Sequence, residues 1–251
     1  MDLNFNTGEE KRKKAVEALA DIIDLGILEK QGQQKPRDYL GGSYIGDNCE
    51  RKIQYTYRNA VKDEDRGFTP KTYRIFDMGH SGEDLVARYI NDAGFILSVE
   101  KGDGYQHGFS RVNGRFKGHV DGVLKGYRGI GPSPIVMPCI WENKMLGEKS
   151  FKDLQSRGLE RSKPIYYAQI IIYMFEMTLT QNPALFSAVN RNTGDIYFEL
   201  VKFNAKECQR LQDRVARVLQ ASDADEILPR VTDDQNSFYC RFCDYQSTCW
   251  G

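Results

Sequence analysis

The chain has no hydrophobic run long enough to span a membrane, and it lacks net charge, because 35 Lys and Arg residues balance 35 Asp and Glu residues. Without a global positive field, binding to a polyanion requires local basic patches. The first residues, Met1-Asp2-Leu3-Asn4, lack the basic and apolar segments of a secretory signal. We therefore expect a cytoplasmic protein with no membrane partner, whose cysteines are thiols available to metals rather than disulfides.

The sequence also contains no internal repeat and no G-x-x-x-x-G-K-[ST] phosphate-binding loop, so the chain cannot drive unwinding of a nucleic acid by itself. Its 251 residues, 40% apolar and 28% charged, have the composition of an ordinary globular protein. This length suits a single large domain with a substantial core.

Hydrophobic periodicity predicts an α/β fold. We expect helices over 9–28, 76–92, 164–180 and 205–221, a further helix start near Cys49, and strands over 95–100, 116–124, 135–145, 185–190 and 196–203. This order predicts a central mixed β-sheet flanked by helices. The first helix is amphipathic, with Val16, Leu19, Ile23 and Ile27 near one face.

Two of the predicted strands carry charged residues where a buried strand should be apolar. Asp121 lies in Gly118–Gly122, and Glu142 and Lys144 are two apart, so their side chains leave the same face of an extended strand. If Asp121 comes from the neighbouring strand, two carboxylates meet in one small volume. They are costly to desolvate unless a cation lies between them. Mg²⁺ or Mn²⁺, which prefer oxygen ligands, is the simplest candidate.

Polar residues on two predicted helices extend this pattern. His80 and Glu83 are three apart and share a face, and Gln169 and Tyr173 are four apart on an otherwise apolar helix. A buried helix has little reason to carry Gln inward unless its amide is hydrogen-bonded.

Taken in order, Gly79…Glu83, Asp121, Glu142-x-Lys144 and Gln169-x-x-x-Tyr173 resemble the PD-(D/E)XK nuclease superfamily, specifically its RecB-like branch. The resemblance implies a restriction-endonuclease-like core and divalent-metal-dependent hydrolysis of DNA phosphodiesters. It implies that Asp121 and Glu142 are metal ligands, with the backbone carbonyl of Asn143 as a further one.

The resemblance also implies roles for the other residues of the motifs. Lys144 would orient or deprotonate the attacking water and offset charge in the transition state. Gln169 would position the site or the DNA end, and Tyr173 would support it. Members of this branch usually carry His where this chain has Glu83. Glu83 is therefore the preferred additional metal ligand, with His80 as the alternative.

Three cysteines near the end of the chain, Cys240, Cys243 and Cys249, form a C-x₂-C-x₅-C pattern that indicates a metal. The tail lacks the second C-x₂-C or Cys/His pair of a structural zinc site. A fourth thiol must therefore come from elsewhere. Cys139 and Cys208 lie in apolar patterns typical of a core. Cys49 lies beside the cations Arg51 and Lys52, which would favour its thiolate.

One distant N-terminal cysteine followed by C-x₂-C-x₅-C resembles the iron–sulfur nucleases of the RecB-like branch, among them the AddB nuclease domain and the CRISPR-associated exonucleases. The resemblance implies a [4Fe–4S] cluster bound by Cys49, Cys240, Cys243 and Cys249 that ties the ends of the domain together. It implies one nuclease domain, 1–251, with an N-terminal helical part (1–75), a nuclease core (76–221) and a cluster-binding tail (222–251).

The expected function is a metal-dependent exonuclease on single-stranded or resected DNA, in a bacterial, archaeal or phage-infected cell. Without its own motor, such an enzyme acts on strands or ends, or beside a separate helicase or recombination or CRISPR proteins. The basic stretch 152–163 could hold phosphates, and Tyr166 and Tyr167 could stack bases. The alternatives are a DNA-binding or scaffold subunit that no longer cuts, and a structure-specific endonuclease.

Overall fold

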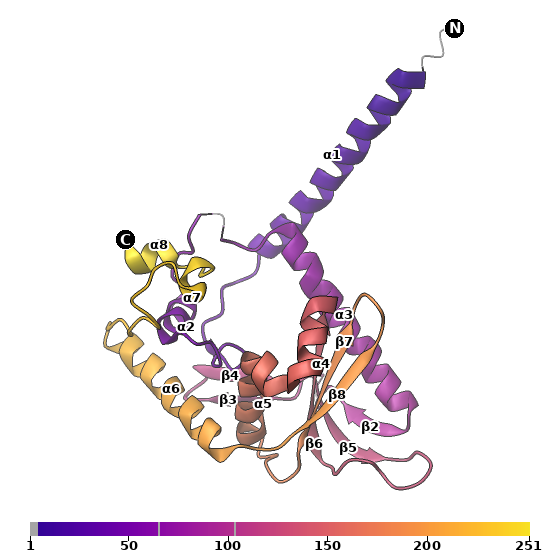
Figure 1. The fold of residues 1–251 in the computed structure, drawn as a ribbon, viewed down its shortest axis with the longest axis vertical. Helices are drawn as coiled ribbons and strands as arrows, with labels where there is room; N and C mark the ends of the chain where they lie inside the picture. Colours follow the sequence, from indigo (N-terminus) through magenta and orange to yellow (C-terminus); the bar gives the residue numbers. More distant parts are fainter. Residues whose placement is uncertain (1–4, 65, 103) are drawn as a thin grey trace.

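The computed structural model describes residues 5–64, 66–102 and 104–251, and it contains two β-sheets with helices packed around them (Figure 1). The helices are α1 (Phe5–Gly32), α2 (Glu50–Tyr57), α3 (Pro70–Asp92), α4 (Glu148–Ser162), α5 (Pro164–Glu176), α6 (Ala205–Asp223), α7 (Phe238–Arg241) and α8 (Gln246–Trp250). The strands are β1 (Leu40–Gly41), β2 (Phe95–Ser98), β3 (Gly108–Arg111), β4 (Phe116–His119), β5 (Gly122–Tyr127), β6 (Cys139–Leu146), β7 (Ala184–Asn190) and β8 (Ile196–Val201).

The larger sheet has the strand order β2-β5-β6-β7-β8 and is mixed, because β6 and β7 run parallel while the other neighbours are antiparallel. The interior strand β7 is buried along its whole length, as expected for a strand covered on both faces. One core cluster contains residues of α5 and α6, and a second contains residues of α3. The predicted fold class, a central mixed sheet flanked by helices, is confirmed.

The strand predicted over 116–124 is two strands. β4 belongs to a small sheet of order β1-β4-β3, and β5 belongs to the large sheet, so Val120 and Asp121 lie where the chain passes from one sheet to the other. Gly122 opens β5 under tight packing, because a Cβ there would lie 2.7 Å from the Leu97 side chain. The change of sheet places Asp121 at a gap in the strand ladder rather than within it.

The helices depart most from the prediction at α3 and α4. α3 begins at Pro70, six residues earlier than expected, because Thr69 caps it by accepting a hydrogen bond from the Thr72 N–H and proline is favoured in the first turn. The polar segment before α5 forms α4, which is interrupted at Gly158 with φ of +73°. Strand β3 was missed because its four residues, Gly108–Arg111, are short and half polar.

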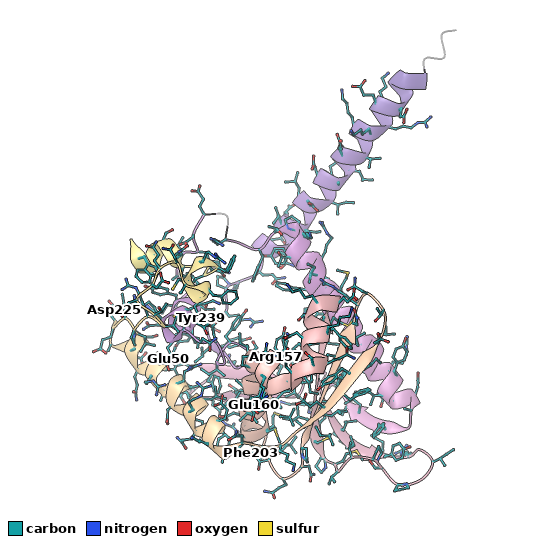
Figure 2. The ribbon with its side chains drawn as sticks, in the orientation of Figure 1. Glu50, Arg157, Glu160, Phe203, Asp225 and Tyr239 are labelled. Carbon is teal, nitrogen blue, oxygen red and sulfur yellow. The ribbon has the colours of Figure 1, made fainter. Side chains whose placement is uncertain are left out.

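The N-terminal third of the chain contacts both the sheet and the last long helix. β1 pairs in parallel with β4, and α2 packs on α6, where Glu50 accepts hydrogen bonds from Arg217 at 2.6 and 3.0 Å (Glu50 is labelled in Figure 2). Gln54 is fully buried and bridges the chain after α6, donating to the Glu226 carbonyl and accepting from the Leu228 N–H. The division at residues 75 and 221 stays a prediction.

Helix α1 was predicted correctly as a helix but not as a packed one. It projects from the body of the molecule (Figure 1). Of the four residues on its predicted apolar face, Val16, Leu19 and Ile23 are exposed and Ile27 is half-buried. None of the described helices combines the length and apolar character needed to cross a bilayer.

Candidate active site

Strand β6 presents Glu142 and Lys144 on one face, as their spacing predicts. The Lys144 ammonium donates hydrogen bonds to Glu142 Oε1 at 2.7 Å and to the Asn143 carbonyl at 2.9 Å. Its Nζ also lies 3.7 Å from Asp121 Oδ2. Two carboxylates therefore meet one ammonium here: Glu142 and Lys144 come from β6, and Asp121 comes from the link between β4 and β5.

The passage between the two sheets holds Asp121 in place. Its Oδ2 accepts a hydrogen bond of 2.8 Å from the backbone N–H of Asn143 on β6. Because β5 and β6 do not pair beyond Gly122 and Trp141, this side-chain contact takes over from the backbone ladder at that point. The gap in the ladder is what lets a carboxylate reach the edge of β6.

One cavity of about 550 Å³ brings together all the side chains predicted for the metal site. Its lining includes Glu83 and His80 from α3, Asp121, Glu142 and Lys144 from the strands, and Gln169 and Tyr173 from α5.

The two carboxylate oxygens of Glu142 differ in their hydrogen bonding. The residue is fully buried, and its Oε1 accepts from both Lys144 and the Gln169 amide. Its Oε2 is buried with no hydrogen-bond partner among the residues that the structure describes. A buried carboxylate oxygen without a partner is strongly disfavoured, so the residues of this cavity have the donor chemistry to hold a cation.

Burial and neighbouring charge raise the pKa of two acidic side chains of the cavity. Burial, and then the Asp121 charge, raise the pKa of Glu83 to about 8 and that of Glu142 to about 7. Burial disfavours the charged form of Lys144, but the Glu142 and Asp121 carboxylates outweigh it and raise its pKa. The ammonium compensates only part of the acidic charge, and a divalent cation would compensate the remainder.

Helix α5 supplies the floor of the cavity. Gln169 is 6% exposed and donates its amide N–H to Glu142 Oε1, which explains an inward-facing Gln on an apolar helix. The Tyr173 ring lies against two glycine backbones: a Cβ on Gly42 or Gly118 would approach that ring to 2.5 or 2.6 Å. These two glycines are therefore needed to seat Tyr173.

His80 is placed less favourably than Glu83, whereas Asn143 offers its backbone carbonyl, as the resemblance implies. His80 lines the cavity but is exposed, whereas Glu83 on the next turn is half-buried and interacts with the Asp121, Lys144 and Glu142 charges. Only the carbonyl of Asn143 faces the site, because its side chain accepts a hydrogen bond of 2.8 Å from Ser187 on the opposite face of β6.

Sequence reasoning missed the cationic and aromatic rim of the cavity. This rim includes Arg37, Tyr39, Tyr44, Lys52, Lys117 and His119. The Lys117 ammonium lies 4.8 Å from the centre of the Tyr39 ring. The sequence predicts no helix or strand over residues 37–44. The only signal was the Gly41-Gly42 pair, which permits the close approach to β4 and Tyr173.

The basic stretch 152–163 does not line this cavity. Three of its four cations are paired within α4 and just beyond it: Lys152 with Glu148 at 2.6 Å, and Lys163 and Arg157 with Asp153, both at 3.2 Å. Tyr166 does line the cavity, 5.5 Å from Lys144 Nζ measured to the ring centre, whereas the Tyr167 hydroxyl accepts from Asn204. The phosphate role expected for 152–163 has no support from this arrangement.

A second, smaller cavity is lined by the four cysteines that the sequence singled out, Cys49, Cys240, Cys243 and Cys249. Cations surround it: Arg51 donates to Cys249 Sγ at 3.4 Å, and Lys52 opposes the rise that burial causes in the pKa of Cys243. The other two cysteines, Cys139 and Cys208, are buried in the apolar core as predicted.

The tail that carries three of these cysteines is bound to the segment around α2. Asp63 N–H donates to the Asp244 carbonyl and Ser247 N–H donates to Asp63 Oδ2, both at 2.8 Å. Lys62 pairs with Asp244 at 2.8 Å, and the Tyr55 and Tyr245 rings meet edge to face. Within the described residues, no group of three or more His, Cys, Asp or Glu side chains could hold a metal ion as the side chains now lie, either here or in the acidic cavity.

Comparisons with known proteins give only distant likenesses. No family model matches the chain. No curated protein matches it either. An alkaline exonuclease (LHK-Exo) from Laribacter hongkongensis is similar in structure at 13% identity and a TM-score of 0.48, over 76% of this chain and 90% of that one.

The same exonuclease in complex with dAMP is similar at 13% identity and a TM-score of 0.48, over 74% of this chain and 89% of that one. SSO0001 is similar at 10% identity and a TM-score of 0.46, over 92% of this chain and 96% of that one. TM-scores below 0.5 are too low to transfer a function, so any function must be argued from the site itself.

Proposed function

We propose that the chain is a divalent-metal-dependent deoxyribonuclease of the PD-(D/E)XK superfamily. The buried and unpartnered Oε2 of Glu142, beside Asp121 and Glu83, is the observation that carries this proposal. Three carboxylates in one cavity are the oxygen-only ligand set that Mg²⁺ or Mn²⁺ prefers. The Asn143 carbonyl, which faces the same site, is the fourth oxygen donor.

A divalent cation held there would lower the pKa of a bound water and neutralise charge on a phosphodiester. The protein's own side chains do the positioning. Lys144 donates to Glu142 and to the Asn143 carbonyl, so its ammonium fixes the two groups that face the metal and offsets developing negative charge. Gln169 holds Glu142 in one rotamer, and Tyr173 closes the floor behind it.

The rim of the same cavity supports DNA as the substrate. Arg37, Lys52 and Lys117 supply cations for phosphates, and Tyr39, Tyr44 and Tyr166 supply rings on which bases can stack. These groups form a local basic patch on a chain whose net charge is zero. Stacking requires unpaired bases, so the substrate is a single strand or a frayed end. Such a substrate favours an exonuclease that works beside a separate helicase or beside recombination or CRISPR proteins.

The proposal can be tested with end-labelled single-stranded, end-labelled double-stranded and circular DNA, each with Mg²⁺, Mn²⁺ or EDTA. We expect metal-dependent degradation of the linear single strand from its ends, little cleavage of the circle, and loss of activity in Lys144→Ala. Cleavage of the circle would indicate an endonuclease. Identical behaviour of wild type and Lys144→Ala on every substrate would show that the enzymatic assignment is wrong.

The same proposal assigns a [4Fe–4S] cluster, as in the iron–sulfur members of the RecB-like branch, to Cys49, Cys240, Cys243 and Cys249. Its support is that these four thiols, from segments almost 200 residues apart, line one cavity among cationic side chains. A cluster there would lock the tail onto α2 and thereby hold Lys52 at the rim of the acidic cavity.

Anaerobic purification tests this assignment. We expect a brown protein whose visible absorbance disappears in Cys243→Ser and persists in Cys208→Ser, the matched control in the apolar core. A colourless wild type that contains zinc would contradict the cluster.

A further inference from the structure

Helix α1 carries an apolar face that no described part of the chain covers. Val16 is 66% exposed, Leu19 57% and Ile22 64%, and every residue from 11 to 23 is exposed. Figure 1 shows the helix projecting from the body. Apart from its contact with α3 near residues 24–31, α1 packs on little of the described chain. A helix held by so little packing is marginal in water, and a contiguous exposed apolar surface marks an interaction site.

The side of α1 that contacts its own chain is a different one. Its half-buried residues, Asp24, Ile27 and Gln31, are three and four apart and so form one stripe. Asp24 is ion-paired with Arg74 of α3. Ile27 is the edge at which this stripe meets the apolar face, so the contact leaves Leu19, Ile22 and the residues beside them free for a second binding partner.

The free face has the spacing of a two-helix seam. Its central stripe runs Arg12, Ala15, Leu19, Ile22, Gly26, Glu29, with alternating steps of three and four residues. Val16, Ile23 and Leu25 flank this stripe and are exposed.

The stripe is complementary to its own reverse. When two copies are laid antiparallel, Leu19 of each faces Ile22 of the other and Ala15 faces Gly26. At each end, Arg12 of one copy then faces Glu29 of the other. A parallel pair would instead place Arg12 against Arg12 and Glu29 against Glu29, with like charges together.

Gly26 supplies an independent argument for a close partner. A glycine inside a helix weakens it. Within the part of the chain that the structure describes, nothing requires the missing side chain, because a Cβ at Gly26 would meet no atom within 4 Å. A second helix crossing close to the backbone at the small layer formed by Ala15 and Gly26 does require it.

We propose that α1 is a dimerisation arm, which pairs antiparallel with α1 of a second copy of this chain through the Arg12–Glu29 stripe. The seam covers the exposed apolar residues of both copies, and the Asp24–Arg74 side stays in contact with each copy's own body. This inference is independent of the nuclease assignment.

Sedimentation equilibrium of the full-length protein tests the pairing. We expect a dimer for wild type and a monomer for Leu19→Glu/Ile22→Glu, with the melting temperature of the sheet core unchanged because the arm lies outside it. The matched control Glu17→Gln, an exposed change outside the stripe, should remain a dimer. A wild type that is monomeric at tens of micromolar would overturn the proposal, including the case in which α1 binds a different protein.

A charge swap tests the antiparallel register. Arg12→Glu and Glu29→Arg should each weaken the dimer about five- to tenfold, since each creates two like-charge contacts per dimer. The combined variant should return the dissociation constant to within about threefold of wild type. A combined variant that is no tighter than the single ones would rule out this register.

Discussion

The acidic cavity and the cysteine cavity both gather ligand-type side chains from distant parts of the chain, but they are held differently. Asp121, Glu142 and Lys144 are fixed by the strands of the central sheet and by direct hydrogen bonds to β6. Cys240 and Cys249 lie in the short helices α7 and α8, Cys243 lies between them, and Cys49 directly precedes α2. These segments are joined mainly by polar contacts between residues 49–63 and 226–249.

This difference indicates which of the two sites depends on a bound metal or cluster to stay folded. The sheet imposes the acidic geometry even though the carboxylates repel, so metal loss should remove activity and leave the fold intact. The cysteine lobe has little apolar core of its own, so loss of the bound group should loosen the tail. The following predictions test this contrast, from the largest expected effect to the smallest.

The largest effect should come from Glu142→Gln. The amide keeps the shape of the side chain but removes the charge at Oε2, so the activity should fall at least about 10²–10³-fold while the fold is kept. Initial rates on labelled single-stranded DNA and far-UV circular dichroism would measure both. Unchanged activity would mean that this oxygen binds no catalytic metal.

The next largest effect should come from Cys243→Ser, through stability rather than chemistry. We expect proteolysis to begin in the tail, between α6 and α8, while the sheet core remains folded. Limited trypsin digestion with mass spectrometry would locate the cuts. Equal resistance of wild type and Cys243→Ser would show that the cysteine cavity is ordered without a bound group.

The pH dependence of the metal-free protein should be smaller but distinctive. The pKa of Glu83 is raised to about 8 in the folded state, above its unfolded value, so its contribution to stability is full below about pH 4.5 and is lost as the pH rises through 8. At about 1.4 kcal/mol per pKa unit, the free energy of unfolding should fall by a few kcal/mol between those limits.

Urea unfolding in EDTA at pH 5.5 and pH 8 measures this fall. Glu83→Gln should flatten the profile, and saturating Mn²⁺ should do the same in wild type. A profile in EDTA that is identical for wild type and Glu83→Gln would contradict the crowded-carboxylate account.

The smallest effect should come from Gln54, which joins α2 to the chain that follows α6. Gln54→Leu removes the amide that satisfies the Glu226 carbonyl and the Leu228 N–H. We therefore expect the free energy of unfolding to fall by about 2 kcal/mol. Thr56→Val, which loses only a half-buried hydroxyl, is the matched control with a smaller loss. Chemical denaturation of both variants would compare them.

Much of the acidic site follows from the sequence, because the strand period of two places Glu142 and Lys144 on one face wherever the strand lies. Charged residues in an apolar strand also mark the site without any knowledge of the fold. The split of 116–124 into β4 and β5 could not be predicted, since both halves have strand patterns and only tertiary pairing separates them.

The rim of the cavity and the free state of α1 escaped prediction for related reasons. Residues 37–44 reach the site through two residues of parallel pairing with β4, a contact too short to leave a periodic signal. The pattern of α1 is amphipathic, and an amphipathic pattern does not say whether its apolar face packs within the chain or against another copy.

The most direct test of the account is the binding of Mn²⁺ to the acidic cavity, followed by electron paramagnetic resonance. Wild type should bind Mn²⁺ at this site, and Glu142→Gln should weaken that binding at least tenfold. Glu160→Gln, an exposed change on α4 (Figure 2), should leave it unchanged. Equal affinity in wild type and Glu142→Gln would contradict the claim that the buried Oε2 of Glu142 is a metal ligand.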